Sequence, residues 1–176
     1  VVLMKKNVFV LFLALLVLIY SQSVFALVEN EQIKVLAVTS EGKGLGAELF
    51  LKVEAGTGKV WVSAEPLVGT TTQSAAQTAV NLAKTYSPDV KKHDYKFSIE
   101  STASVVEGPS AGAAMALLVI SAFEDKKVPS NVALTGTIDE SGAVGHVGGV
   151  YEKSKEAANL GIDLFMIPKG EARQTI

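Results

Sequence analysis

The chain has 176 residues, of which 48% are hydrophobic and 19% charged, so it is long enough for one domain with a core and too short for two ordinary domains. It contains no cysteine, which excludes a disulfide framework, a thiol nucleophile and a cysteine-based metal site. The first 26 residues hold Lys5, Lys6 and no acid, which leaves 14 basic and 18 acidic side chains in the rest. An acidic domain without a basic cluster is a poor binder of nucleic acid, so no nucleic-acid partner is expected.

Residues 1–26 have the order of a secretory signal peptide. Lys5 and Lys6 precede an apolar run over residues 8–20, and Val24 and Ala26 place small residues before a cleavage point. The run is too short to cross the hydrocarbon layer of about 30 Å, although adding residues 24–28 would make it just long enough. The sequence therefore predicts an exported protein, extracellular or at the cell surface, with an uncleaved membrane anchor as the alternative.

The first half of the presumed mature chain predicts three strands, a helix and a fourth strand, in that order. Residues 48–53 and 59–63 are joined by a short link with two glycines, which predicts a hairpin. Helical spacing of alanine and leucine predicts a helix over Thr70–Tyr86, ended by Ser87 and Pro88. The remaining strands are expected at residues 33–39 and 95–101.

The second half predicts helices mixed with short strands. A helix over residues 110–123 is apolar nearly all round and is expected to be buried. A helix over residues 150–160 should end at Gly161 in a left-handed cap. Short strands are expected at residues 132–135, 143–147 and 164–167. This order favours an α+β fold, with mixed small sheets packed with helices, over a regular βαβ array.

Two kinds of ligand site are disfavoured. The run GTGK at residues 56–59 is similar to the end of a phosphate-binding loop, but Val53 and Val60 stand where that loop needs Gly and Ser or Thr. His93 and His146 are the only histidines, and their spacing fits no metal-binding pattern. The sequence predicts neither a metal nor a cofactor.

Ser110 is the first candidate for chemistry. It stands at the start of the predicted buried helix, where free N–H groups and the helix dipole favour a developing negative charge. The small residues that follow leave room for a substrate. The alternative is that Ser110 only caps the helix, which is a common role of serine.

A serine nucleophile needs a base, and two candidates are present. One is His146, with an acid such as Asp139 behind it. The other is Lys153 in the first turn of the helix over residues 150–160, where the dipole and burial would both lower its pKa. The alternative for Lys153 is a solvated lysine, as expected for Lys155.

Four segments in order resemble the proteolytic domain of Lon proteases. They are VEGPSAG at 106–112, ALTGTI at 133–138, GAVGHVGGVYEK at 142–153 and LFMIPK at 164–169. Ser110 and Lys153 are 43 positions apart, as in that family, and the similarity covers roughly residues 33–171. The resemblance implies the Lon proteolytic fold and hydrolysis of peptide bonds.

The resemblance also implies roles for particular residues. Ser110 would be the nucleophile and Lys153 the general base, with Thr135 orienting the lysine. The backbone at Ala111 and Gly112 would lie near the oxyanion. Glu107 stands where some relatives have aspartate, as a supporting residue.

Lon proteins carry an ATPase module upstream, and this sequence has only the leader and no phosphate loop. The chain is therefore similar to exported, ATP-independent Lon-like proteins of the kind predicted in archaeal genomes. A polypeptide substrate and a homo-oligomer are expected, because family members form rings, and residues 27–176 are expected to be a C-terminally incomplete domain. The alternatives are an inert Lon-like peptide-binding or assembly module and a Ser–His–Asp hydrolase of another fold.

Overall fold

The computed structural model describes residues 29–65, 67–124 and 126–172. The predicted leader at residues 1–26 lies outside these ranges, and the same holds for the last four residues. Within the described ranges, no helix combines the length and the apolar character that a membrane crossing requires.

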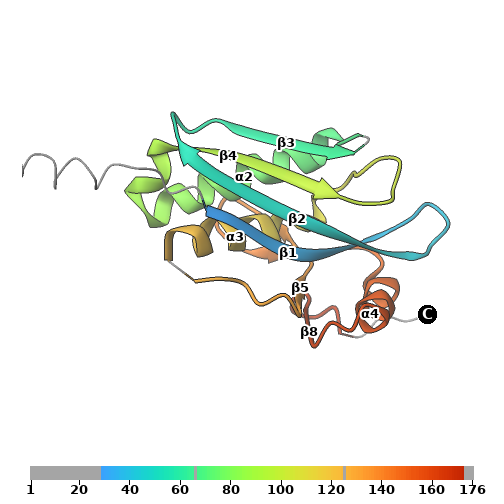
Figure 1. Ribbon diagram of the computed structural model, residues 1–176. Helices are drawn as coiled ribbons and strands as arrows, with labels where there is room; N and C mark the ends of the chain where they lie inside the picture. The colour runs from blue at the N-terminus through green and yellow to red at the C-terminus, as the bar shows by residue number, and fades with distance from the viewer. Residues whose placement is uncertain (1–28, 66, 125, 173–176) are drawn as a thin grey trace, which may run out of the picture.

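A six-stranded mixed sheet forms the centre of the fold (Figure 1). Its strands lie in the order β3-β4-β2-β1-β5-β8. Neighbours pair antiparallel from β4 through β2 to β1 and parallel elsewhere. The bounds are β1 Glu29–Val38, β2 Gly44–Ala55, β3 Val60–Glu65, β4 His93–Glu100, β5 Val132–Leu134 and β8 Leu164–Met166. A separate antiparallel pair consists of β6 Thr137–Ile138 and β7 Val144–Gly145. This mixed sheet with helices confirms the predicted fold class.

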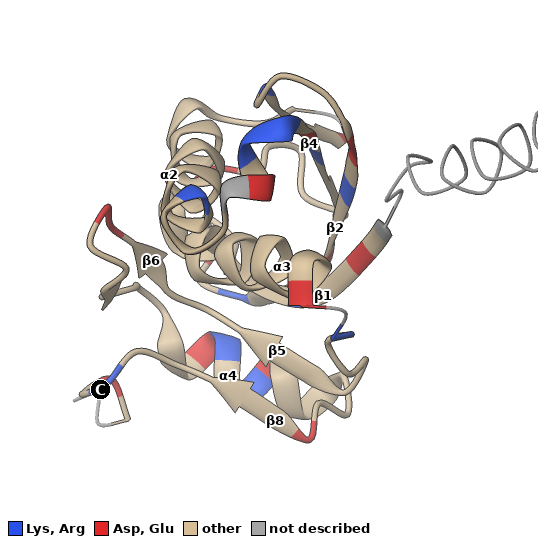
Figure 2. Cartoon of the chain, turned by 90° about the vertical axis from the view of Figure 1, so that its left-hand side faces the viewer, with Lys and Arg blue, Asp and Glu red and all other residues tan. Residues whose placement is uncertain are grey.

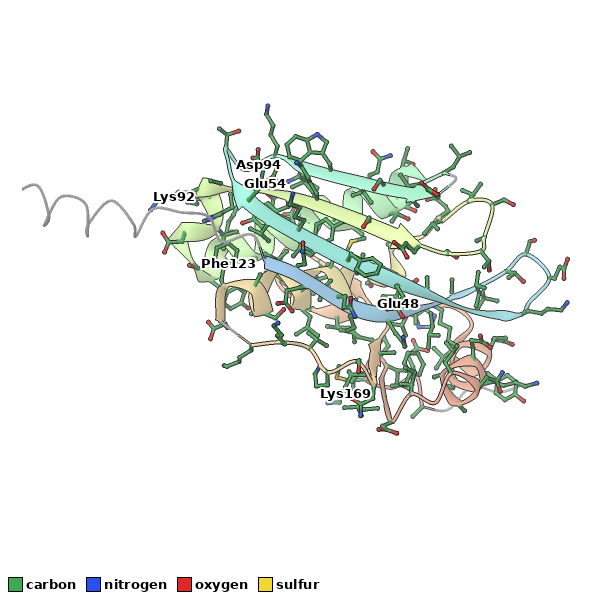
Figure 3. The ribbon with its side chains drawn as sticks, in the orientation of Figure 1. Glu48, Glu54, Lys92, Asp94, Phe123 and Lys169 are labelled. Carbon is green, nitrogen blue, oxygen red and sulfur yellow. The ribbon has the colours of Figure 1, made fainter. Side chains whose placement is uncertain are left out.

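The predicted hairpin between residues 48–53 and 59–63 is wrong, because β4 lies between β2 and β3. Glu54 on β2 is opposite Asp94 on β4, beside the link to β3 (Figure 3). The Asp94 carboxylate accepts hydrogen bonds from the amides of Thr57 (2.7 Å) and Lys59 (2.9 Å). These bonds attach the link to the start of β4, so the chain crosses over that strand instead of folding back on β2.

The same hydrogen bonds explain the resemblance of residues 56–59 to a phosphate loop. Amides that would face a phosphate face a carboxylate of the chain itself, and the bonds from Lys59 and Thr57 hold the pKa of Asp94 below its ordinary value. The glycine-containing link is therefore a structural turn, and the anion that its amides bind is the Asp94 carboxylate.

Helices α2 (Thr70–Tyr86) and α3 (Gly112–Glu124) cover one face of the sheet, and α4 (Val150–Asn159) packs near one end of the other face (Figures 1 and 2). Two short 3₁₀ helices, η2 (Pro88–Lys92) and η3 (Pro109–Ala111), precede β4 and α3. Successive residues of β2 face opposite sides of the sheet, which explains why helices cover both faces. The odd positions 49, 51 and 53 are buried under α2 and α3, while Gly44 and Gly46 approach α4.

The main core lies between the sheet and the pair α2 and α3. Alanines recur along the buried side of α2, and α3 begins with small residues, so the two helices approach closely and fill the space under Tyr95 and Phe97. Figure 2 shows that α3 is almost without charged residues, and its burial confirms the prediction. A smaller apolar cluster of Leu36, Ala133 and Ala157 attaches α4 to the opposite face. Gly161 follows α4 with φ +66°, as predicted for its cap.

We expect Gly44→Ala to destabilise the contact between β2 and α4. A Cβ at this position would overlap the backbone oxygen of Glu152 and lie 2.7 Å from Cβ of Glu156. Overpacking of this kind costs about 1–3 kcal/mol. Gly148→Ala is the matched control, since a Cβ there meets no atom within 4 Å. Urea unfolding should show a lower midpoint for Gly44→Ala alone, and equal midpoints would contradict the packing.

Candidate active site

Ser110 lies in η3, the tight turn directly before α3. The N-cap position of this turn is Gly108, so Ser110 does not take the helix-capping position that was the alternative for it. The Ser110 residue is partly exposed, and together with Ala111 it lines a groove. A partly exposed serine at a groove can meet a bound molecule.

The Ser110 turn is attached to the segment between β5 and β6. The Ser110 carbonyl accepts a hydrogen bond from the Gly136 amide (2.8 Å) and one from Thr135 Oγ1 (3.3 Å). The Ala113 amide donates in return to the Gly136 carbonyl (3.0 Å). The Gly112 amide donates to the Pro109 carbonyl, so it already has an acceptor in this structure.

Lys153 comes from α4 on the opposite face of the sheet and points into the protein. Only 3% of the residue is exposed, and Nζ donates to Thr135 Oγ1 at 3.1 Å. Burial lowers the pKa of the Lys153 amine below its ordinary value, because an ammonium loses hydration inside the protein. Lys153 is therefore not the solvated lysine of the alternative, which Lys155 resembles in its exposure.

Thr135 connects the two groups. Its hydroxyl oxygen accepts a hydrogen bond from Lys153 Nζ, and its O–H donates one to the Ser110 carbonyl. The hydroxyl group is thus acceptor and donor at once. Ser110 Oγ and Lys153 Nζ, which are both described, share no direct hydrogen bond in this structure. Catalytic hydrogen bonds are often long before substrate binds and tighten in the complex. A neutral Lys153 amine held this way could accept a proton from a hydroxyl beside it.

The structure does not bring together the other candidate base and its acid. Asp139 closes its own turn, accepting from the amides of Ser141 (2.9 Å) and Ala143 (3.0 Å). His146 is exposed and pairs with Glu171, not with Asp139. His93 Nδ1 contacts the Asp89 carbonyl at 2.8 Å. Across the described part of the chain, no group of three potential ligands could hold a metal ion.

A groove of about 570 Å³ runs past Ser110. Residues 35–40 at the end of β1 and residues 101–108 after β4 line it in two continuous stretches. Aliphatic and hydroxyl side chains dominate this lining, and Glu107 is its one charged residue. Such a groove has the shape and chemistry to hold an extended, weakly polar chain.

Glu107 contacts the first turn of α2 rather than the group around Lys153. Its Oε1 accepts hydrogen bonds from the amide of Thr71 (3.1 Å) and from the Thr71 hydroxyl. Thr71 is not among the site residues that the sequence predicts. Nothing in the pattern of three threonines at residues 70–72 distinguishes one of them, since the contact joins positions 36 residues apart.

We expect Thr135→Val to destabilise the fold by about 1–3 kcal/mol, because it leaves a buried amine without its acceptor. Thr135 is 1% exposed, so water cannot replace the lost hydroxyl without opening the site. Thr135→Ser keeps the hydroxyl and is expected to cost less, about the transfer energy of one methyl group. Urea unfolding of the two variants tests this, and an equal loss in both would show that the hydrogen bond adds nothing.

Comparison with known families matches residues 31–175 to the Lon protease (S16) C-terminal proteolytic domain. The chain is 36% identical over 141 residues to a Lon protease of Clostridioides difficile, covering 76% of this chain and 18% of that relative. It is 32% identical over 156 residues to a Lon protease of Phenylobacterium zucineum, covering 80% of this chain and 19% of that relative. The chain thus spans less than a fifth of the length of these curated relatives.

Proposed function

Because this chain belongs to the family of Lon protease proteolytic domains, we propose that it is a serine endopeptidase with Ser110 as nucleophile and Lys153 as general base. The observation that carries the proposal is the buried Lys153 amine, hydrogen-bonded to the threonine that also holds the Ser110 carbonyl. A buried lysine with a lowered pKa is the arrangement that base catalysis by an amine requires, and the groove lies at the Ser110 side of this arrangement.

The reaction follows from these groups. Neutral Lys153 takes the proton of Ser110 Oγ as that oxygen attacks the peptide carbonyl. The ammonium so formed gives its proton to the leaving amine, and an acyl-enzyme results. Lys153 then takes a proton from water as the water oxygen attacks the ester. It gives that proton to Ser110 Oγ as the ester C–O bond breaks, which releases the new carboxyl end and restores the serine hydroxyl. Thr135 accepts an N–H of Lys153 throughout, which leaves the lone pair of the amine for Ser110.

The proposed donors to the oxyanion are the backbone amides at Ala111 and Gly112. The amides at a helix start are suited to this role, because they carry partial positive charge and are fixed in place. The Gly112 amide, which donates to the Pro109 carbonyl here, would have to share or exchange that bond when the oxyanion forms.

The rate of hydrolysis is expected to rise with pH, because the base acts as the neutral amine. Below the pKa of Lys153, each pH unit should raise kcat/KM about tenfold, with a plateau reached below the ordinary lysine value. A profile of kcat/KM between about pH 6 and pH 10 checks this. A rate that follows the titration of a histidine, or does not change with pH, would contradict lysine as the base.

We further propose that the activity needs no nucleotide and acts outside the cytoplasm on unfolded polypeptide. The leader pattern at residues 1–26 supports export. The link at residues 56–59, the one segment similar to a phosphate loop, has two of its amides bonded to Asp94. The continuous stretches along the groove suit a flexible, extended chain.

An inert peptide-binding or assembly module is the second candidate, favoured by the missing direct bond between Ser110 and Lys153. Hydrolysis of fluorescently quenched casein without ATP separates the two, measured before and after treatment with a fluorophosphonate. We expect equal rates with and without ATP and magnesium, and loss of activity after treatment. Hydrolysis only with ATP would contradict nucleotide independence. Intact casein together with an unlabelled Ser110 would favour the inert module.

A further inference from the structure

We infer that Glu107 and Thr71 form a pair of positioning residues that hold the Ser110 turn in the place its chemistry needs, an inference that rests on the proposed function. The pair joins the residues just before Ser110 to the first turn of α2. Neither residue reaches the reacting atoms, so both would act through the backbone between Glu107 and Ser110.

The hydrogen bonds form a short chain. The Gly108 amide donates to Thr71 Oγ1 at 3.0 Å, and the Thr71 hydroxyl donates to the Glu107 carboxylate. The Thr71 amide donates to the same carboxylate at 3.1 Å. The carbonyl of the same residue, Gly108, accepts a hydrogen bond from Thr72 Oγ1 at 3.1 Å. Both polar groups of Gly108, two residues before Ser110, are thus held by α2.

Backbone pairing fixes the same segment from the side. The Val106 amide donates to the Leu67 carbonyl, and the Gly69 amide donates to the Val106 carbonyl, both at 2.9 Å. A Cβ at Gly69 would overlap the Glu107 carboxylate, so the carboxylate lies directly against the N-cap of α2. The segment before Ser110 is attached to α2 by main chain and by side chain at once.

Electrostatics explains why a carboxylate stands here. The first turn of α2 contains no acidic residue, and its N-cap Gly69 makes no side-chain capping bond. Glu107 supplies from outside the negative charge that a helix N-terminus favours. The hydrogen bonds from Thr71 in turn hold the pKa of the Glu107 carboxyl below its ordinary value, so the group stays an acceptor at neutral pH.

The opposite end of the turn is held by Gly136 and Thr135, the residue that also binds Lys153. Ser110 therefore lies between two attachments, α2 on one side and the Lys153 side on the other. Releasing the first would let the hydroxyl shift relative to the amine, and small displacements of a nucleophile can cost about a hundredfold in rate. The groove itself would be changed less, so the loss should fall on kcat rather than KM.

The test compares Thr71→Val, Thr71→Ser and Glu107→Gln in the full chain, with Thr70→Val and Glu65→Gln as matched controls. Thr70 and Glu65 are exposed, on α2 and at the end of β3. We expect Thr71→Val and Glu107→Gln to lower kcat about 10–100-fold with little change in KM. Thr71→Ser, which keeps the hydroxyl, should restore kcat to within about threefold. Fluorophosphonate labelling of Ser110 should be slower in Thr71→Val and Glu107→Gln than in the parent, and close to the parental rate in Thr71→Ser.

The outcomes separate this inference from the proposed function. If the parent cleaves casein and Thr71→Val keeps its kcat while only its urea midpoint falls, the pair stabilises the fold and does not position Ser110. If Thr71→Ser is as slow as Thr71→Val, the hydroxyl is not the cause, and the inference also fails. If the parent neither cleaves casein nor labels at Ser110, the proposed function fails, and the positioning role fails with it.

Discussion

Replacing Lys153 with methionine is expected to abolish peptide hydrolysis and, at the same time, to stabilise the fold. The activity should fall by about 10²–10⁴, the usual contribution of a general base. Methionine keeps an unbranched chain of similar length in the space that Lys153 fills, 3% exposed, but brings no charge into it. Below the folded pKa of Lys153, where the buried amine is charged, its removal should raise the free energy of unfolding by about 1–3 kcal/mol.

The pH dependence of that stabilisation has a defined sign. The pKa of Lys153 is lower in the folded state than its ordinary value of 10.5, so the unfolded chain binds more protons between the two values. The parent therefore gains stability as pH rises through this window, and the advantage of Lys153→Met should shrink there. Below the folded pKa, both states carry the ammonium, and the whole advantage should be present.

Lys155→Met is the matched control on the same helix, because Lys155 is exposed. It should change neither the rate of hydrolysis nor the free energy of unfolding by more than about 0.5 kcal/mol. Urea unfolding and casein hydrolysis of both variants decide the matter. If Lys153→Met were inactive and also less stable than the parent, the lysine would be a structural group, and its loss of activity would report unfolding.

Replacing Ser110 with alanine is expected to lower hydrolysis by about 10⁴-fold or more while leaving the fold unchanged. The bonds that hold this turn use the Ser110 carbonyl, which accepts from Gly136 and Thr135 and which alanine keeps. The loss should therefore be purely chemical, with KM for casein little changed because the groove is retained.

Ser130→Ala offers a control, since Ser130 is an exposed serine that does not line the groove. It should keep the parental rate to within a few fold. The two variants are compared by kcat and KM for quenched casein and by their unfolding midpoints. Residual hydrolysis in Ser110→Ala at a tenth of the parental rate or more would assign the nucleophile to another group.

The sequence predicted the elements that depend on local pattern. Helical spacing of alanine marked α2 over Thr70–Tyr86, and the apolar run after Pro109 marked the buried α3. Such local patterns did not predict the order of the strands in the sheet. Two strands joined by a short glycine-containing link are typical of a hairpin. Only the hydrogen bonds that the amides of Thr57 and Lys59 donate to Asp94, 37 and 35 residues away, explain why β4 separates these strands.

For the candidate site, too, the sequence predicted the residues with local motifs but not the contacts between distant segments. Ser110, Thr135 and Lys153 were marked by their motifs, and the resemblance gave each a role. Lys153 and the Ser110 carbonyl are connected through the Thr135 hydroxyl. This contact depends on the packing of α4 against β1 and β5, which no local pattern predicts. Thr71 was missed altogether, because a threonine in a helix start gives no sign of a carboxylate that arrives from 36 positions further along the chain.

The most direct test of the catalytic pair is the rate at which a fluorophosphonate modifies Ser110, followed by mass spectrometry of the labelled peptide. This reaction uses the nucleophile and its base but needs no bound polypeptide. We predict a single adduct on Ser110 in the parent, faster at higher pH, and labelling at least about a hundredfold slower in Lys153→Met. An adduct on another residue, or an equal labelling rate in Lys153→Met, would contradict the pairing of Ser110 with Lys153.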